Sequence, residues 1–335
     1  MLNVKYVVVT GVAGFIGYHV AKTLLSEGVN VIGVDNINDY YDVSLKKSRL
    51  RDISDSNFDA DFIFYEVDIA HKSALFDTVK NRDIDVIIHL AAQAGVRYSI
   101  ENPQAYIDSN ITGFLNVMQM SVEKHVNHLI YASSSSVYGN TSVSPFSEDQ
   151  VVDKPVSIYA ATKKSNELMA NVFTHQFGLN TTGLRFFTVY GPWGRPDMAP
   201  FKFVQRILSD QTIDVYNHGD HIRDFTYIDD IVAGVIGLYK KGPDENEKHR
   251  IFNIGAKDPV HLLSFIESIE RSLGLTLNGL EAKKNMLPMQ MGDVRETFAD
   301  VSKLVDEIGY QPKTFVDEGV DKFVGWYKCY YADSI

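Results

Sequence analysis

The segment Val9-Thr10-Gly11-Val12-Ala13-Gly14-Phe15-Ile16-Gly17 is the strongest indication of the fold class, because its three glycines stand at G-x-x-G-x-x-G spacing. The apolar run 7–9 leads into it and is expected to be a buried strand, and residues 16–26 continue as a helix that ends at Gly28. A glycine turn between strand and helix lets the backbone approach a pyrophosphate, whose charge the helix N-terminus favours. We therefore predict a dinucleotide site at Gly11, Gly14, Phe15, Ile16 and Gly17.

A carboxylate follows the second predicted strand, residues 31–34, in the form of Asp35. At this place it would accept hydrogen bonds from both hydroxyls of the adenosine ribose and repel a 2′-phosphate, which favours NAD over NADP. The alternative roles for Asp35 are a helix cap or a solvated turn. Asn36 and Asn38 are expected to extend the polar rim, and Asp68, with its neighbour Ile69, to lie near the adenine.

Strands and helices alternate through the first half of the chain. Further strands are expected at residues 62–65, 86–89 and 129–132, and helices near 73–80 and 104–124. This alternation indicates crossover units and a parallel sheet that is covered on both faces, with ligands beyond the carboxyl ends of its strands. The predicted fold class is α/β, a Rossmann-type doubly wound parallel sheet.

The pattern changes after about residue 185, where segments become shorter and turn signals denser. We expect residues 1–185 to form the NAD-binding domain and residues 186–335 to form mainly a smaller substrate domain. A helix predicted at 229–240 indicates that residues 226–250 return to the main sheet. The two domains would thus be interleaved along the chain.

Composition excludes several classes of protein. A formal net charge of −11 over 335 residues argues against a nucleic-acid partner, which requires a basic face. The single cysteine, Cys329, cannot form an internal disulfide or a zinc site of several thiolates. The apolar run near the N-terminus is too short to span a membrane, so we expect a cytoplasmic protein with no membrane partner.

Tyr159 and Lys163 stand four residues apart and would share one face of a helix. A nearby ammonium stabilises a phenolate, so the pair can exchange a proton with a substrate hydroxyl while hydride moves to or from the cofactor. The serine run 133–136 follows the strand at 129–132, where a hydroxyl can contact the reacting oxygen.

Together these motifs resemble the extended short-chain dehydrogenase/reductase family. The resemblance rests on residues 10–17, Leu90-Ala91-Ala92-Gln93, 133–139 and 159–163, and it extends over nearly the whole chain. It implies tightly held NAD contacted also by Leu90, Ala91, Ala92 and Gln93, a nucleotide-sugar substrate and a homodimer. It further implies that Tyr159 is the base, that Lys163 tunes it and binds the nicotinamide ribose, and that Ser134 or Ser136 is the hydroxyl partner.

Residues 185–200, which include Gly191-Pro192-Trp193-Gly194-Arg195-Pro196-Asp197, resemble the signature of UDP-glucuronate 4-epimerases. The resemblance implies that Thr188 and Arg195 contact a sugar carboxylate, which suits a bidentate guanidinium. Alternatively, Arg195 pairs with Asp197. By the same resemblance Arg223, in the run 221–225, and Arg295, in the run 292–295, bind the diphosphate of a UDP-sugar.

The predicted reaction is the reversible C4 epimerisation of UDP-glucuronate to UDP-galacturonate through a transient 4-keto sugar and bound NAD. Ser135 and Ser136 stand where related dehydratases carry an Asp-Glu pair and uronate decarboxylases a Glu, so the acid–base groups of those reactions are absent. The alternatives are a 4-epimerase of UDP-glucose or UDP-N-acetylhexosamine and a non-catalytic NAD-sensing module.

Overall fold

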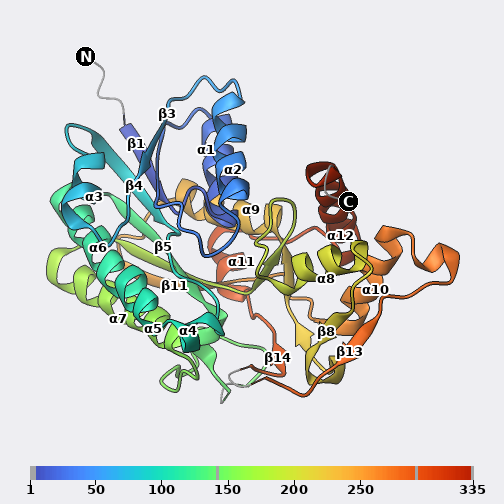
Figure 1. The fold of residues 1–335 in the computed structure, drawn as a ribbon. Coiled ribbons are helices and arrows are strands. Elements are labelled where there is room, and N and C mark those ends of the chain that lie inside the picture. The colour runs from blue at the N-terminus through green and yellow to red at the C-terminus, as the bar shows by residue number, and fades with distance from the viewer. Residues whose placement is uncertain (1–4, 141–142, 291–292, 333–335) are drawn as a thin grey trace.

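Seven parallel strands form the largest sheet of the molecule, in the order β11-β6-β5-β4-β1-β2-β3 (Figure 1). The structure is a computed structural model that describes residues 5–140, 143–290 and 293–332. Chain order reverses between β1 and β4, which is the topological switch point where open α/β sheets bind ligands. The strands are β1 (Lys5–Thr10), β2 (Val31–Asp35), β3 (Phe62–Glu66), β4 (Asp83–His89), β5 (His128–Ser134), β6 (Thr181–Phe186) and β11 (His249–Ile254).

Helices cover both faces of this sheet, because its strands are apolar on both sides. In β1, Val7 and Val9 belong to one hydrophobic cluster and Val8 to the other. One face is covered by α1 (Phe15–Ser26), α2 (Val43–Asp55), α9 (Ile228–Lys241) and α11 (Ser302–Ile308); the other by α3 (Lys72–Thr78), α6 (Phe114–Glu123) and α7 (Ile158–Phe177). The predicted doubly wound fold is therefore confirmed. Within the described residues, no helix combines the length and apolar character needed to cross a membrane.

The helix expected over residues 104–124 is interrupted in the structure. Short helices α4 (Tyr98–Glu101) and α5 (Pro103–Tyr106) precede a π-helical segment, η1 (Ile107–Gly113), and only then does α6 begin. The buried amide of Asn110, in this π-helical segment, donates to Gln93 O at 3.0 Å and to Thr162 Oγ1 at 3.0 Å, and accepts from Gln93 N at 2.8 Å. Such π-helical turns are frequent at functional sites, and here the turn ties the predicted cofactor residue Gln93 to α7.

The smaller part of the molecule is built from short strands and three helices. Strand β7 (Thr188–Tyr190) pairs with β10 (Phe225–Tyr227), β8 (Ile213–Val215) with β13 (Lys284–Met286), and β9 (Ile222–Arg223) with β12 (Val260–His261) and β14 (Glu296–Thr297). The helices are α8 (Ala199–Leu208), α10 (Leu262–Leu273) and α12 (Val316–Tyr330). Because α9 and β11 lie with the large sheet and β6 runs past residue 185, the two parts interleave, and the domain limits remain a prediction.

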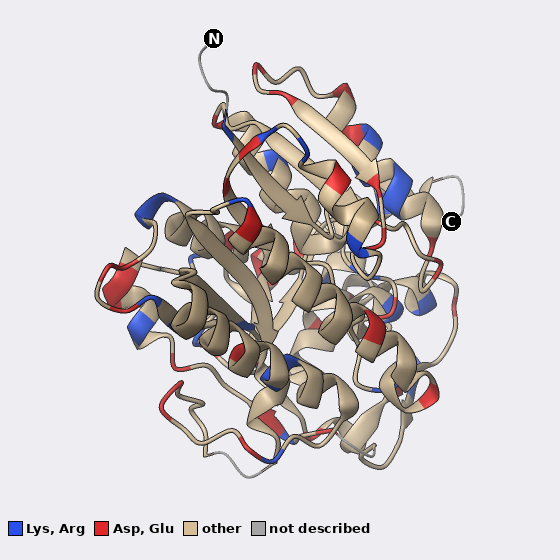
Figure 2. Ribbon diagram, turned by 90° about the vertical axis from the view of Figure 1, so that its left-hand side faces the viewer, with Lys and Arg blue, Asp and Glu red and all other residues tan. Residues whose placement is uncertain are grey.

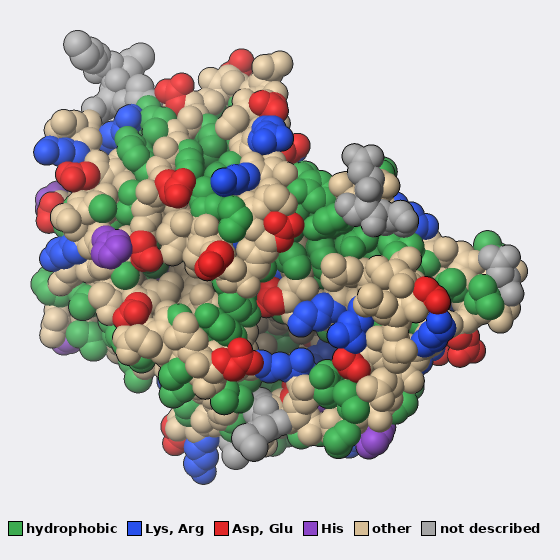
Figure 3. Space-filling view, viewed as in Figure 1, with side chains coloured by type: hydrophobic (Ala, Val, Ile, Leu, Met, Phe, Trp, Pro, Cys, Tyr) green, Lys and Arg blue, Asp and Glu red, His purple; other side chains and the backbone are tan. Residues whose placement is uncertain are grey.

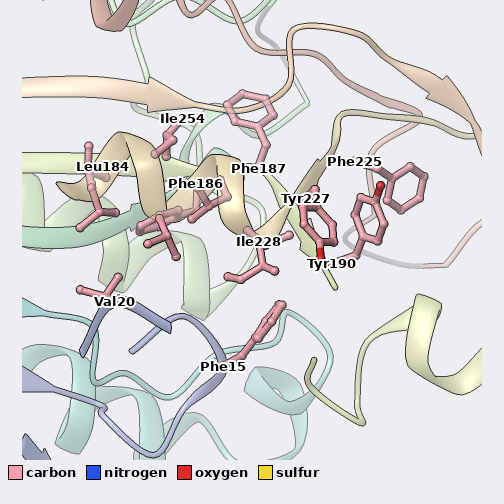
Figure 4. Close-up of a cluster of buried hydrophobic side chains, with 14 of the residues drawn as sticks. Phe15, Val20, Leu184, Phe186, Phe187, Tyr190, Phe225, Tyr227, Ile228 and Ile254 are labelled. Carbon is pink, nitrogen blue, oxygen red and sulfur yellow. The ribbon is translucent and has the colours of Figure 1, made fainter. Parts of the chain in front are cut away.

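One hydrophobic cluster joins the two parts. Figure 4 shows Phe15 and Val20 of α1 on the same cluster as Tyr190, Phe225 and Tyr227 of the smaller part. The rings of Phe225 and Phe265 stack with centroids 4.0 Å apart. Continuous apolar packing of this kind resists sliding of one part against the other, so the groove between them has a defined shape.

A buried ion pair connects α7 to the large sheet. Arg185 of β6 donates to both carboxylate oxygens of Glu167 at 2.8 and 2.9 Å, and Ser133 Oγ donates to Glu167 Oε1 at 2.7 Å. Burial alone would raise the pKa of Glu167, but the hydrogen bonds and charge of Arg185 outweigh it and hold that pKa below its ordinary value. The pair therefore sets the position of α7, on which Tyr159 and Lys163 lie.

Candidate active site

A cavity of about 360 Å³ opens at the carboxyl ends of the large sheet, beside the switch point between β1 and β4. It brings together nearly all the residues that the sequence predicts for the cofactor and for catalysis. The predicted residues that line it are Gly11, Gly14, Phe15, Ile16, Gly17, Asp35, Asn36, Asn38, Ile69, Leu90, Ala91, Ala92, Gln93, Ser134, Ser136, Tyr159, Lys163, Thr188 and Arg195.

The glycine-rich turn fits a dinucleotide by its shape. A Cβ on Gly11, whose φ is +72°, would lie 2.7 Å from Ala91 N, and one on Gly17 would lie 2.1 Å from Gly11 O. Gly14 is the N-cap of α1 and no side chain caps that end, which leaves N–H groups available to an anion. The turn therefore has the close packing and the donors that a pyrophosphate requires.

Asp35 lies at the end of β2 and is 9% exposed. Its carboxylate accepts from Ala13 N at 3.0 Å and from Ile37 N at 2.9 Å, so it also fixes the glycine-rich turn. Burial raises the pKa of this carboxyl, and the two N–H bonds work against that rise. Because two oxygens provide about four acceptor sites, room remains for ribose hydroxyls.

Asp68 does not line the cavity, in contrast to its neighbour Ile69. Its carboxylate accepts from Ala70 N at 2.8 Å and from Asn36 Nδ2 at 3.0 Å. In the structure Asp68 thus holds a turn and orients Asn36, and its contact with an adenine remains a prediction.

Tyr159 lies in the cavity on the first turn of α7, which Ser157 caps by accepting from Ala160 N at 3.1 Å. Burial raises the pKa of Tyr159, and a hydrogen bond with Ser134 and the charge of Arg195 act against the rise. Ser134 Oγ also accepts from Ser136 N at 3.1 Å. Ser134 lines only this cavity, together with Tyr159, whereas Ser136 lines both this cavity and a second one.

Lys163 is 2% exposed and its Nζ donates to Ala132 O at 2.8 Å. Burial lowers the pKa of this ammonium to about 7. An ammonium has three donors, so two remain for a ligand in the cavity, such as the hydroxyls of a ribose. The residue thus fits the cofactor-binding role that the sequence predicts.

A second cavity, of about 530 Å³, adjoins the first through shared residues that include Ser136 and Thr188. Arg223 lines it, as do three cations to which the sequence analysis assigned no role: Arg97, Lys202 and Arg206. Figure 3 shows Lys and Arg side chains around a hollow in the middle of this face of the molecule. Asp197, Asp214 and Asp293 also line this cavity, so its four cations exceed its acids by one, and these cations could bind a diphosphate although the chain as a whole is acidic.

The structure does not bring all four predicted substrate-binding residues to the two cavities. Arg295 is exposed, pairs with Asp220 at 3.0 Å and lines neither cavity. Arg223 donates to Asp293 at 3.0 Å and to Val294 O at 2.6 Å, while Gly292 lies outside the described residues. The run 292–295 thus supports Arg223 in this structure, and contact of Arg295 with a diphosphate stays a prediction.

Arg195 reaches the first cavity while bound to Asp197. Its Nε donates to Asp197 Oδ1 at 3.0 Å and its Nη2 to Oδ2 at 2.5 Å, and Tyr40 donates to Oδ2 at 3.2 Å. The pairing considered as an alternative is therefore present, but it occupies one edge of the guanidinium. A guanidinium has five donors, so donors remain for a second carboxylate.

Three side chains of the first cavity, two from the loop after β2 and one from α2, were not expected from the sequence motifs. Tyr40, Tyr41 and Lys46 line the first cavity, and Lys46 Nζ donates to Asn38 O at 2.6 Å. The available signal was the aromatic pair directly after Asp39, close to the predicted ribose ligand Asp35. Nothing in the local pattern indicated that these side chains turn toward the cofactor half of the groove.

Fold and site together define a dinucleotide-dependent enzyme with a Tyr-x-x-x-Lys pair at the end of a Rossmann-type sheet. A profile of the NAD-dependent epimerase/dehydratase family matches residues 7–255. The chain belongs to this family. The resemblance noted from the motifs is thereby confirmed, as are the NAD-dependent epimerase type of enzyme and the cofactor, NAD.

Relatives cover almost the whole chain. The protein CapI of Staphylococcus aureus is 51% identical over 97% of this chain and 99% of its own. A probable UDP-glucuronate 4-epimerase of Rhizobium meliloti is 45% identical over 95% of this chain and 96% of its own. The crystal structure of UDP-glucuronic acid 4-epimerase from Bacillus cereus, in complex with UDP-glucuronic acid and NAD, is similar at 32% identity, with a TM-score of 0.88 over 98% of this chain and 100% of that one.

The buried ammonium of Lys163 yields a prediction about stability and pH. Its folded-state pKa of about 7 lies below the unfolded value of about 10.4, so the unfolded chain binds more protons between these pH values. The cost of burying the charge is greatest below pH 7 and fades toward pH 10. In nucleotide-free protein, Lys163→Met should raise Tm at pH 6 on the order of 5 °C. Calorimetry at pH 6 and pH 10 measures the change in Tm. An equal gain in Tm at both pH values would contradict the lowered pKa of Lys163.

Proposed function

We propose that this chain interconverts UDP-glucuronate and UDP-galacturonate by reversible oxidation at C4 of the sugar. The observation that carries the proposal is a cationic side chain, Arg195, in the same cavity as Ser134, Tyr159 and Lys163. A carboxylated sugar would place its C4 hydroxyl at the tyrosine and its carboxylate at the arginine. The relatives that bear the name UDP-glucuronate 4-epimerase support this assignment.

Tyr159 transfers the proton in this reaction. As a phenolate it accepts the proton of the C4 hydroxyl, and Ser134, which lines the same cavity, orients that hydroxyl. Bound NAD supplies the acceptor for the hydride of C4 and, with its positively charged ring, a further charge that favours the phenolate. Tyr159 returns the proton when the 4-keto sugar is reduced on its other face, so the overall reaction is redox-neutral.

The second cavity holds the rest of the substrate in this proposal. Arg223 and its neighbouring cations bind the diphosphate, and Thr188, which lines both cavities, lies between that site and the sugar. A tether fixed at the diphosphate allows the keto sugar to rotate while it stays bound. Thr188 would then hydrogen-bond to the sugar carboxylate together with Arg195.

Tyr159→Phe separates an epimerase from an NAD-sensing module. The variant should retain NAD, because it keeps the ring and loses only a hydroxyl, while turnover of UDP-glucuronate falls by about 10²–10⁴-fold. Turnover is measured by sugar analysis without added cofactor, and bound NAD by release on denaturation. Wild-type protein that holds NAD but converts neither UDP-glucuronate nor UDP-glucose would refute the proposed activity.

Arg195→Ala tests the substrate. Charge-assisted bonds to a carboxylate contribute about 1.5–3 kcal/mol, so affinity for UDP-glucuronate should fall by roughly 10–150-fold. UDP-glucose lacks the carboxylate, so the variant loses no charge-assisted bond to it. Affinity for UDP-glucose should therefore change by less than about threefold. Titration calorimetry with both ligands measures this ratio, and Arg51→Ala, at an exposed position on α2, is the control. Equal losses for both sugars would favour the neutral-hexose alternative.

We further propose a homodimer formed through α4, η1 and α7. These adjacent elements expose apolar side chains, namely Ile100, Ile107, Leu168 and Val172. The helices on this side of the molecule carry few charged residues (Figure 2). Burial of such a patch between two copies is favourable. Sedimentation should therefore give twice the chain mass of 37.7 kDa, and a species at that chain mass would refute the dimer.

A cytoplasmic location is also a proposal. It is supported by the proposed UDP-sugar substrate and by Cys329, which is exposed and free, as expected of a thiol kept reduced. Cell fractionation with an antibody to the chain tests it, and recovery outside the cytoplasm would contradict it.

A further inference from the structure

Arg49 is a fully buried cation in the middle of α2, with 0% of its surface exposed. Its four hydrogen bonds all go to neutral oxygens: Nη1 donates to Ala13 O and Tyr41 OH at 2.8 Å each, and Nη2 to Trp193 O at 2.6 Å and Gly194 O at 3.2 Å. Its Nε has no partner among the described residues. No carboxylate hydrogen-bonds to Arg49 among the described residues, although its charge acts on the buried Asp35, and burial of such a cation is costly unless its donors find acceptors.

The bonds of Arg49 join two parts of the site that are far apart in sequence. Ala13 belongs to the glycine-rich turn that fits a dinucleotide, whereas Trp193 and Gly194 immediately precede Arg195, which reaches the sugar end of the cavity. A guanidinium can hold both at once because its donors point in fixed directions. A lysine in the same place would have one nitrogen for four acceptors.

The turn that Arg49 holds is strained and is anchored a second time by α1. Trp193 has a φ of +61°, which a large side chain rarely adopts. His19 Nε2 lies 3.0 Å from Pro192 O and, facing a carbonyl, must carry the ring proton. Burial lowers the pKa of His19 to about 4, so this donor is neutral and unchanged at neutral pH. The ring of Trp193 packs on Tyr18 of α1, with centroids 5.4 Å apart.

A second connection reaches Arg195 through its own partner. Asp197, which binds Arg195, also accepts from Tyr40, and Arg49 donates to the neighbouring Tyr41. Arg49 therefore binds the backbone before Arg195 directly, and the carboxylate that orients the guanidinium of Arg195 is bound by the residue next to an Arg49 partner.

We infer that Arg49, assisted by His19, is a positioning residue that fixes the guanidinium of Arg195 relative to the cofactor turn. It touches neither reacting atoms nor the proposed substrate, and acts through the turn at 192–194. This inference deepens the proposed function, because the group that it positions is the one proposed to bind the sugar carboxylate. Loss of Arg49 should therefore impair recognition of the carboxylate and spare recognition of the nucleotide.

Arg49→Lys tests the inference in the purified protein with its own nucleotide. The substitution keeps the positive charge but removes the planar guanidinium with its donors in fixed directions. Affinity for UDP-glucuronate should therefore fall about tenfold, while affinity for UDP-glucose stays within about twofold. Titration calorimetry with both ligands gives the ratio. Arg51→Lys, at an exposed position two residues along α2, is the matched control and should change neither affinity. Equal losses for both ligands would show a general structural role and overturn the inference.

Tryptophan fluorescence reports the solvent access of Trp193, in the turn 192–194, without any substrate. The chain has two tryptophans, so Trp326→Phe leaves Trp193 as the only one. In that background, Arg49→Lys should increase acrylamide quenching of Trp193, and unchanged quenching would overturn the inference. A second outcome separates the two proposals. If Arg49→Lys increases the quenching but the wild-type protein does not prefer UDP-glucuronate, the proposed substrate is refuted and the positioning role of Arg49 stands. If Arg49→Lys does not fold, His19→Leu should raise the quenching and His19→Gln, which keeps a donor, should restore it.

Discussion

Arg185 and Glu167 form a buried ion pair on which the arrangement of the site depends. The pair joins β6 to α7, and Ser133 at the end of β5 donates to the same carboxylate. One carboxylate thus connects β6 to the two elements that carry Ser134, Tyr159 and Lys163, namely β5 and α7. Because removing one partner of such a pair leaves an uncompensated charge, at a cost of about 3–5 kcal/mol, the register of α7 against the sheet has no low-energy alternative.

The charge distribution divides the groove into two ends with different chemistry. At the cofactor end the buried acid Asp35 lies beside a glycine-rich turn whose helix N-terminus is free to bind an anion. At the other end Arg97, Lys202, Arg206 and Arg223 surround the second cavity. Asp197, Asp214 and Asp293 line the same cavity, so the local excess is one positive charge, which the net charge of −11 does not reveal. Total charge therefore argues against a nucleic-acid partner but gives no information on small anionic ligands.

Local patterns predicted the parts of the site that depend on neighbours in sequence. The three glycines at 11, 14 and 17 indicated a dinucleotide turn, the spacing of Tyr159 and Lys163 indicated a catalytic pair, and one cavity contains both. The helix expected over 104–124 was wrong in detail, because the π-helical segment around Asn110 depends on Gln93 and Thr162, which are distant in sequence. Asp68 and Arg295 matched family positions, but local partners hold both side chains away from the cavities.

Local patterns were sufficient to predict a doubly wound, dinucleotide-binding enzyme, because glycine spacing, helix periodicity and strand composition are properties of neighbouring residues. The folded arrangement was needed to show which cations share the groove and that Arg49 joins the two ends of the site. Those contacts connect segments separated by up to 145 residues, as between Arg49 and Gly194. They depend on how the packed core orients whole elements, which no local pattern records.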